Sequence, residues 1–256
     1  MSLPPDQRPL DAASLTDDAF LGGQLRILQP RKGFRAGLDA VVLAAAVPAR
    51  PRQRVCDLGA GAGTAGLCVA ARVSGVHVTA VDIDADMLGV AAQNAARNDL
   101  SGCFEVMEAD LAGRARNLPR QHFHHVLTNP PFHDETRGTR APDDRKASAK
   151  SIGAASLLHW LRLARAITRP GGTVAAILPP AQLPVALEAL SPHGRGVTVI
   201  PLWPRAGVAA KRMILLAQAN SAAPLVMSPG LLLHDPDGKP AFAAEEILRR
   251  GKALST

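Results

Sequence analysis

The chain has 256 residues, 47% of them hydrophobic, which favours one large globular domain and excludes a disordered polymer. Its 29 Lys and Arg against 22 Asp and Glu give a net charge of +7, which favours a polyanionic partner over a cationic one. Aromatic residues are only 3% and Tyr is absent, so a binding surface built from many stacked rings is excluded.

The N-terminus and the apolar runs predict a cytoplasmic protein. Residues 1–18 lack the basic-then-apolar pattern of a signal peptide, and the longest apolar run, residues 40–47, is far shorter than the ~20 residues that cross a bilayer. The three cysteines lie in apolar stretches typical of buried thiols, so no disulfide is expected. Four histidines between residues 122 and 133 have no Cys or carboxylate to complete a ligand set, so no metal is expected.

The first 50 residues are predicted to form an N-terminal extension, and residues 51–256 the main domain. The extension begins with a Pro-rich tail, followed by a segment with hairpin character at residues 24–34. The apolar residues of 38–47 continue without alternation, which indicates a covering helix rather than a half-exposed strand.

From residue 54 onward, apolar runs that indicate strands alternate with patterns that indicate helices. The predicted strands cover residues 54–59, 76–83, 104–110, 125–129, 173–178, 197–202 and 213–219. The predicted helices cover residues 64–74, 85–98, 154–168 and 181–190. The sequence Arg169-Pro170-Gly171-Gly172 is interpreted as a sharp stop before the next strand.

Strands joined by helical crossovers form parallel βαβ units, which stack into an open sheet covered on both faces. The predicted fold class is therefore α/β: a Rossmann-like, seven-stranded mixed sheet with helices on both faces. The last two strands lack a long helix between them, so the final strand is expected to be antiparallel to its neighbour.

A glycine-rich turn follows the first strand of the main domain, Asp57-Leu58-Gly59-Ala60-Gly61-Ala62-Gly63, and leads into a helix. Glycines allow positive φ and a close approach of ligand to backbone at the carboxyl ends of the strands, where open α/β sheets bind ligands. The acid that ends the second strand, Asp82, suits a ribose. A dinucleotide and S-adenosylmethionine would both use these features.

The acid Asp57 favours S-adenosylmethionine, because a carboxylate just before the glycines repels a pyrophosphate and suits a cationic amino-acid group. Asp110 ends the third strand at the same edge, where an acceptor could meet an adenine amino group. The expected cofactor-binding residues are Asp57, Gly59, Ala60, Gly61, Gly63, Asp82, Ile83, Asp110 and Leu111.

The fourth strand ends in the most informative stretch, Asn129-Pro130-Pro131-Phe132, which is the predicted catalytic motif. Two prolines cannot continue a central strand, so they fix a rigid turn at the ligand crevice. The Asn129 amide oxygen and the Pro130 carbonyl are two acceptors for a planar amino group, and Phe132 could stack on the ring that carries it. These hydrogen bonds would make the amine nucleophilic toward a sulfonium methyl group.

The glycine loop, Asp82 and Asn129-Pro130-Pro131-Phe132 together resemble the Rossmann-like, S-adenosylmethionine-dependent amino-methyltransferases. More narrowly, residues 24–250 resemble the bacterial N6-adenine methyltransferases that modify valine tRNA beside the anticodon. The resemblance implies S-adenosylmethionine as cofactor, a tRNA or other structured RNA as substrate, and a role for Asp39 in ordering the cofactor pocket. A monomer or a weak homodimer is expected.

Several alternatives stay open. Phe132 is followed by His133-Asp134, which resembles the ribosomal-RNA guanine-N2 methyltransferases, so the target base is adenine or guanine. Glutamine N5 methyltransferases of translation release factors have a similar Asn-Pro-Pro motif, usually with Tyr in place of Phe132. A nicotinamide-dependent oxidoreductase could use the same glycine loop, and a non-catalytic RNA-binding protein could retain the fold.

Three basic segments are expected near the substrate, within residues 26–35, 137–150 and 205–212. The RNA-contacting residues expected among them are Arg35, Arg137, Arg140, Arg145, Lys146, Arg205, Lys211 and Arg212. A further cluster, Arg50, Arg52 and Arg54, is placed at the opposite end of the predicted sheet.

Overall fold

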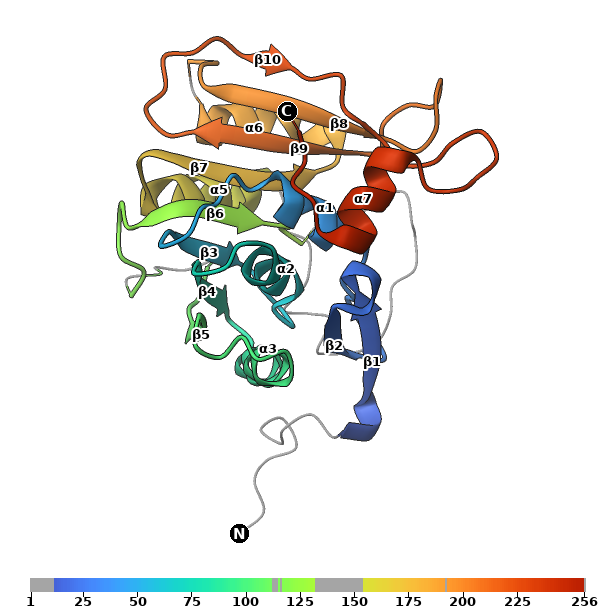
Figure 1. Cartoon of the computed structure of the whole chain (residues 1–256). Helices are drawn as coiled ribbons and strands as arrows, with labels where there is room; N and C mark the ends of the chain where they lie inside the picture. The colour runs from blue at the N-terminus through green and yellow to red at the C-terminus, as the bar shows by residue number, and fades with distance from the viewer. Residues whose placement is uncertain (1–11, 112–114, 116, 132–153, 192, 256) are drawn as a thin grey trace.

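A mixed β-sheet forms the centre of the computed structural model, which describes residues 12–111, 115, 117–131, 154–191 and 193–255 (Figure 1). Its nine strands follow the order β10-β8-β9-β7-β6-β3-β4-β5, with β11 also paired to β8. The bounds are β3 Arg54–Leu58, β4 His77–Asp82, β5 Phe104–Glu108, β6 Phe123–Thr128, β7 Thr168–Leu178, β8 Val197–Trp203, β9 Arg212–Gln218, β10 Val226–Met227 and β11 Leu231–Leu232.

The directions of the strands confirm the predicted fold class. Neighbouring strands from β7 to β5 are parallel, whereas β9 lies antiparallel between β7 and β8. The seven predicted strands are all present, and the last long one is antiparallel as expected. The short strands β10 and β11 were not predicted from the sequence.

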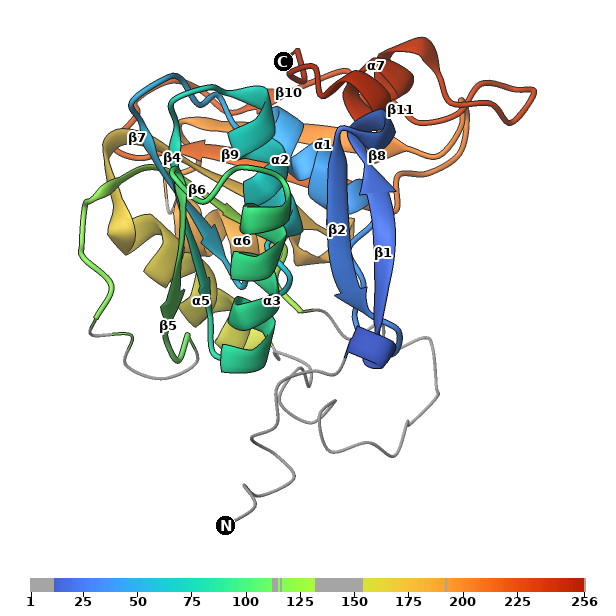
Figure 2. The ribbon, with the colours of Figure 1, turned by 60° about the horizontal axis from the view of Figure 1, so that its bottom comes forward.

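Helices cover both faces of the sheet (Figures 1 and 2). One face carries α1 Leu38–Ala46, α2 Thr64–Arg72 and α3 Ala85–Arg97, and the other carries α5 Ala154–Ile167 and α6 Leu183–Leu190. A 3-10 turn, η4 Pro180–Gln182, precedes α6, so that helix begins later than predicted. Helix α7, Phe242–Arg250, was not predicted and packs against α1.

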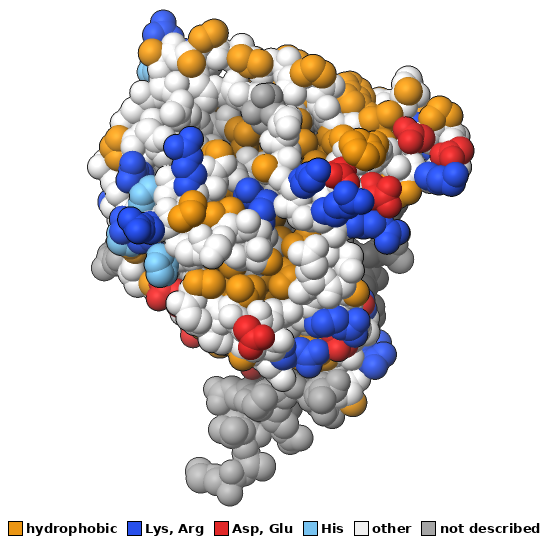
Figure 3. All heavy atoms as spheres, viewed as in Figure 1, with side chains coloured by type: hydrophobic (Ala, Val, Ile, Leu, Met, Phe, Trp, Pro, Cys, Tyr) orange, Lys and Arg blue, Asp and Glu red, His pale blue; other side chains and the backbone are white. Residues whose placement is uncertain are grey.

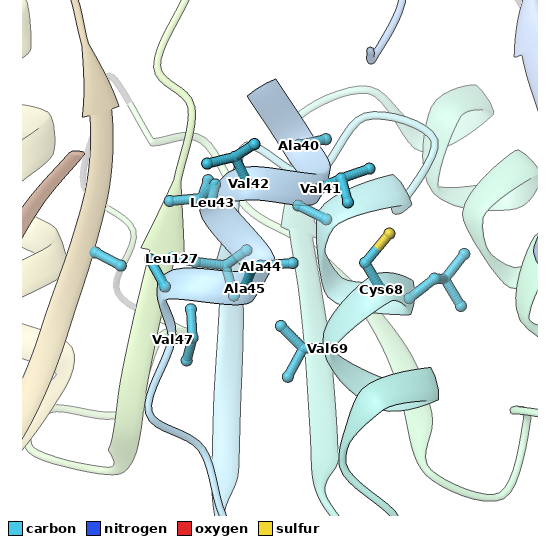
Figure 4. Close-up of a cluster of buried hydrophobic side chains, with 14 of the residues drawn as sticks. Ala40, Val41, Val42, Leu43, Ala44, Ala45, Val47, Cys68, Val69 and Leu127 are labelled. Atoms are coloured by element: carbon cyan, nitrogen blue, oxygen red, sulfur yellow. The ribbon is translucent and has the colours of Figure 1, made fainter. Parts of the chain in front are cut away.

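Helix α1 is the predicted covering helix, and it is apolar because it packs against the sheet, beside α2 (Figure 4), and against α7. Val42 and Leu43 are fully buried, beside Leu127 of β6 and Val69 of α2. Among the described residues, no helix combines the length and the apolarity that crossing a bilayer needs.

Alternation along the strands decides which face each side chain meets. In β3, Val55 belongs to the core cluster under α1 and α2, whereas Cys56 and Leu58 belong to the cluster under α5 and α6. By the same alternation Asp57 faces α2, and in β6 Thr128 faces α5 while Leu127 faces α1. This alternation positions the polar groups of the site described below.

A two-stranded hairpin lies beside α3 (Figure 2). Its strands are β1 Leu15–Phe20 and β2 Leu25–Pro30, preceded by the 3-10 turn η2 Ala12–Ser14 and joined across η3 Leu21–Gly23. The prediction of hairpin character at residues 24–34 was therefore wrong in its bounds, because the first strand lies earlier. Asp17 and Asp18 disfavour a strand by propensity, and ion pairs hold both in the fold.

The predicted stop at residues 169–172 is a second correction, because these residues lie inside β7. Helix α5 ends at Ile167 as the stop implied, but β7 begins at once. Gly171 takes a positive φ of 73° and its N–H donates to the Ala219 carbonyl over 3.0 Å, which keeps the segment paired with the chain after β9. The pairing of β6 with β7 shifts in register between Phe123 and His125, which accommodates residues 169–172 within the strand.

Candidate active site

The glycine loop lies at the carboxyl end of β3. The N–H groups of Gly59 and Ala60 donate to the Val81 carbonyl over 2.8 and 3.0 Å, which ties the loop to β4. Gly59 has a φ of 78°, and a Cβ there would lie 2.7 Å from the Trp160 ring, so packing as well as φ requires glycine. Gly61 also has a positive φ, but a Cβ there would meet no atom within 4 Å. The loop therefore has a packed side and an open side.

The Asp82 carboxylate organises the open side of the loop. It accepts hydrogen bonds from the N–H groups of Gly61 and Ile83, both over 2.8 Å, and of Asp84, over 3.1 Å. The exposed Ile83 side chain follows directly. The structure therefore brings Asp82 and Ile83 to the loop, as the sequence predicts.

Asp57 lies beneath the loop, with only 3% of its surface exposed. Its Oδ2 accepts a hydrogen bond from the Gly66 N–H of α2 over 2.7 Å. Burial raises the pKa of Asp57 to about 7, against the effect of this hydrogen bond, and the charge of Asp82 raises it further. Two carboxylates close together favour a cation at this position.

Asp110 and Leu111 follow β5 at the same edge. Asp82 and Glu108 are paired residues of β4 and β5, and the Ala109 N–H donates to the Asp82 carbonyl over 2.8 Å. Asp110 is exposed whereas Leu111 is buried in the core under α5. Asp110 thus lies two residues beyond the partner of Asp82, next to the other predicted cofactor residues.

The Asn129 turn begins beside the glycine loop. Leu58 and Thr128 are paired residues at the ends of β3 and β6, so Gly59 and Asn129 each leave the sheet at the same level. Asn129 is half-buried and Pro130 is buried. The Asn129 amide has no hydrogen bond to another described residue, and Phe132 lies outside the described part of the chain.

A buried hydrogen-bond relay, which was not predicted from the sequence, connects the two loops. The Thr128 hydroxyl donates to the Leu58 carbonyl over 2.7 Å and accepts from the Trp160 indole N–H over 2.9 Å. The same Trp160 ring contacts Gly59. The sequence offered one signal for this relay: Trp160 is one of only two Trp residues in the chain.

Replacing Thr128 with Val should lower the free energy of unfolding by about 1–3 kcal/mol, because the indole N–H loses its partner. The turnover number should also fall about tenfold, since the glycine loop and the Asn129 turn are held less firmly relative to each other. Thr128→Ser should restore both. Thr168→Val is the matched control: its buried hydroxyl bonds to the Ala164 carbonyl at the other end of the sheet, so it should cost stability alone. Equal turnover in both Val variants would contradict the relay's role.

The predicted RNA-contacting arginines are partly neutralised in the fold. Arg35 pairs with Asp18 over 2.7 Å and Arg212 pairs with Asp39 over 3.4 Å, whereas Arg205 and Lys211 have no ion pair among the described residues. Asp17 and Asp18 of the hairpin thus offset much of the positive charge of residues 26–35 (Figure 3). Arg137, Arg140, Arg145 and Lys146 lie outside the described residues. Asp39, expected to order the cofactor pocket, ties α1 to β9.

The described part of the chain has surface hollows but no cluster of metal ligands. It contains no group of three or more His, Cys, Asp or Glu side chains arranged for a metal ion. Two hollows of about 500 and 490 Å³ lie at the opposite, amino edge of the strands rather than at the glycine loop.

Known proteins resemble the chain in sequence and fold. The model of the methyltransferase small domain family matches residues 36–144, which include the glycine loop, Asp82 and Asn129. A solved structure of a predicted O-methyltransferase from Agrobacterium tumefaciens is 30% identical, covers 85% of this chain and 98% of its own, and superposes with a TM-score of 0.70.

Two further matches are more distant. A tRNA1(Val) (adenine(37)-N6)-methyltransferase of Dickeya chrysanthemi is 29% identical over 65% of this chain and 65% of its own length. The chain matches 60 to 66% of the length of the first three such relatives, less than two thirds. The Thermus thermophilus 16S rRNA N2 G1207 methyltransferase, solved with AdoMet and guanosine, shares the fold at 19% identity, with 80% and 50% coverage and a TM-score of 0.55.

Proposed function

The chain belongs to the Rossmann-like methyltransferases, and on that premise we propose that it transfers a methyl group from S-adenosylmethionine to an exocyclic amino group of an RNA base. The base we propose is an adenine, methylated at N6, in a tRNA anticodon loop. The relatives named tRNA1(Val) (adenine(37)-N6)-methyltransferases support this choice.

The residues of the glycine loop fit this cofactor. The open side at Gly61 gives room for a ligand, and Asp82 lies there as an acceptor for ribose hydroxyls. The carboxyl groups of Asp57 and Asp82 lie on either side of the loop, and in their ionised form they would suit an ammonium and a sulfonium group and disfavour a pyrophosphate. This arrangement supports S-adenosylmethionine over a dinucleotide.

The observation that carries the proposal is the pairing of Leu58 with Thr128, which starts the glycine loop and the Asn129 turn side by side. In this position Asn129 and the Pro130 carbonyl would accept two hydrogen bonds from a base amino group and hold its nitrogen toward the cofactor. Bound S-adenosylmethionine would supply a sulfonium methyl group: the N–C bond would form as the C–S bond breaks, S-adenosylhomocysteine would be released, and the amine would lose its proton to solvent.

The test is methylation of purified tRNA, a ribosomal-RNA fragment and a release-factor peptide with isotope-labelled S-adenosylmethionine, followed by mass spectrometry of the nucleosides. We expect N6-methyladenosine in tRNA. Label in guanine N2 or in a glutamine would change the substrate while keeping the chemistry. No transfer to any of the three, or tighter binding of NAD than of S-adenosylhomocysteine by calorimetry, would overturn the proposal.

A further inference from the structure

The edge of the sheet opposite the glycine loop carries a group of arginines. Arg54 starts β3, Arg120 precedes β6, Arg165 lies near the end of α5 and Arg169 lies near the start of β7. None of the four forms an ion pair with a described residue. Lys, Arg and His side chains gather at the left of Figure 3, where β3, β6 and β7 begin in Figure 1. We call these four arginines the cationic track.

The cationic track contrasts with two of the arginines predicted to contact RNA. Arg35 and Arg212 each have a carboxylate partner. Helix dipoles account for a basic residue such as Arg165 at the end of a helix, but not for Arg54, Arg120 and Arg169, which lie outside helices. The track therefore holds cationic charge that the described chain does not balance.

The geometry at His124 points to an anionic ligand. The Arg54 backbone N–H lies 3.2 Å from Nδ1 of His124, and Nη1 of Arg169 lies 2.8 Å from Nε2. Burial and the nearby arginines lower the pKa of His124, which favours the neutral ring with a single N–H. When Nε2 is the unprotonated nitrogen, it accepts one N–H of the Arg169 guanidinium and holds that side chain in place. The other guanidinium N–H groups have no partner among the described residues, and an anionic oxygen would accept from them.

A groove of about 490 Å³ continues the cationic track along α5, and Arg120, Arg162 and Arg165 are among its lining residues. One acid lines it, Glu188, which pairs with Arg162 over 3.0 Å. Helix α5 leads from the carboxyl edge of the sheet to the amino edge, a length of about 21 Å at ~1.5 Å per residue. An RNA stem lying along α5 would therefore extend from the Asn129 turn to the cationic track.

We infer that the cationic track binds backbone phosphates of the RNA substrate at a distance from the target base. The inference rests on the proposed function and extends it, because the base-binding turn and the track would hold different parts of one RNA. Phosphate contacts of this kind position a nucleic acid and add affinity without reading its sequence. A substrate reduced to the modified loop would not reach them.

The test compares full-length tRNA with a short hairpin that keeps the anticodon loop and only the two base pairs that close it, too short to span α5. The triple variant Arg120→Gln, Arg165→Gln and Arg169→Gln should raise KM for full-length tRNA about tenfold or more and leave kcat unchanged. For the hairpin, both constants should stay within about twofold, since it makes no contact with the track. The slope of log affinity for tRNA against log salt should become less steep by about one unit for each lost contact.

The matched control replaces Arg97, Arg249 and Arg250 with Gln, which removes the same charge from arginines that have carboxylate partners. It should change KM for neither RNA. An unchanged KM for full-length tRNA in the track variant, or an equal loss with the hairpin or in the control, would overturn the inference. If the wild-type protein methylates neither RNA, the proposed function fails, and the affinity of both variants for tRNA still decides the inference.

Discussion

Replacing Asn129 with Ala should lower kcat for RNA methylation by about 10²–10³-fold, the loss typical of removing one preorganised hydrogen-bonding group from a reacting centre. The Asn129 side chain is half-buried at the end of β6 and has no hydrogen bond to another described residue, so its removal should cost little stability. Affinity for S-adenosylhomocysteine should stay within about twofold, because the cofactor is expected to contact the glycine loop instead. Calorimetry and single-turnover methylation measure the two quantities.

The matched control for this variant is Asn117→Ala. Asn117 is an exposed amide whose Nδ2 donates to the Glu108 carbonyl over 2.8 Å, near the end of the edge strand β5. Its loss should leave kcat unchanged. If Asn129→Ala turned over at the wild-type rate, the base amino group would have to be held by other residues.

The main sheet could be predicted because its strands and helices have distinct sequence periods. Central parallel strands are buried on both faces and therefore appear as continuous apolar runs, as Val126 and Leu127 do in β6. The glycines after β3 and the acids at the ends of β4 and β5 then mark the carboxyl edge. These signals are local in sequence, and they were sufficient for the fold class and for the residues around Asp82.

Contacts between distant parts of the chain could not be predicted in the same way. Asp17 and Asp18 argue against a strand until Arg26, Arg35 and Arg97 are seen beside them. Helix α7 has a polar sequence, and its contacts with α1, β11 and the hairpin turn explain its place. The packing of Trp160 against Gly59 joins residues about 100 positions apart, so no local pattern reveals it.

Replacing Asp57 with Asn should stabilise the free protein at high pH and weaken cofactor binding. The pKa of Asp57 is raised to about 7 in the fold, whereas an unfolded Asp titrates near ~4. Between these values the folded state binds more protons than the unfolded state, so Asp57 lowers stability as pH rises from about 4 to about 7. Above that range the cost is up to about 4 kcal/mol, at ~1.4 kcal/mol for each pKa unit. Asn removes this cost and keeps an oxygen acceptor for the Gly66 N–H.

The pH dependence distinguishes this effect from a general change in packing. Asp57→Asn should melt above the wild-type temperature at pH 8, and the two proteins should converge as the pH falls below about 4, where Asp57 is protonated in both states. Wild-type affinity for S-adenosylhomocysteine should rise with pH through about 7, because the ionised carboxylate attracts the ligand ammonium, and the affinity of the variant should stay low and flat. The control Asp99→Asn changes an exposed carboxylate and should shift neither curve. A variant less stable than wild type at pH 8 would mean that Asp57 is held charged by a partner, and the negative region beneath the glycine loop would then be no basis for cation binding.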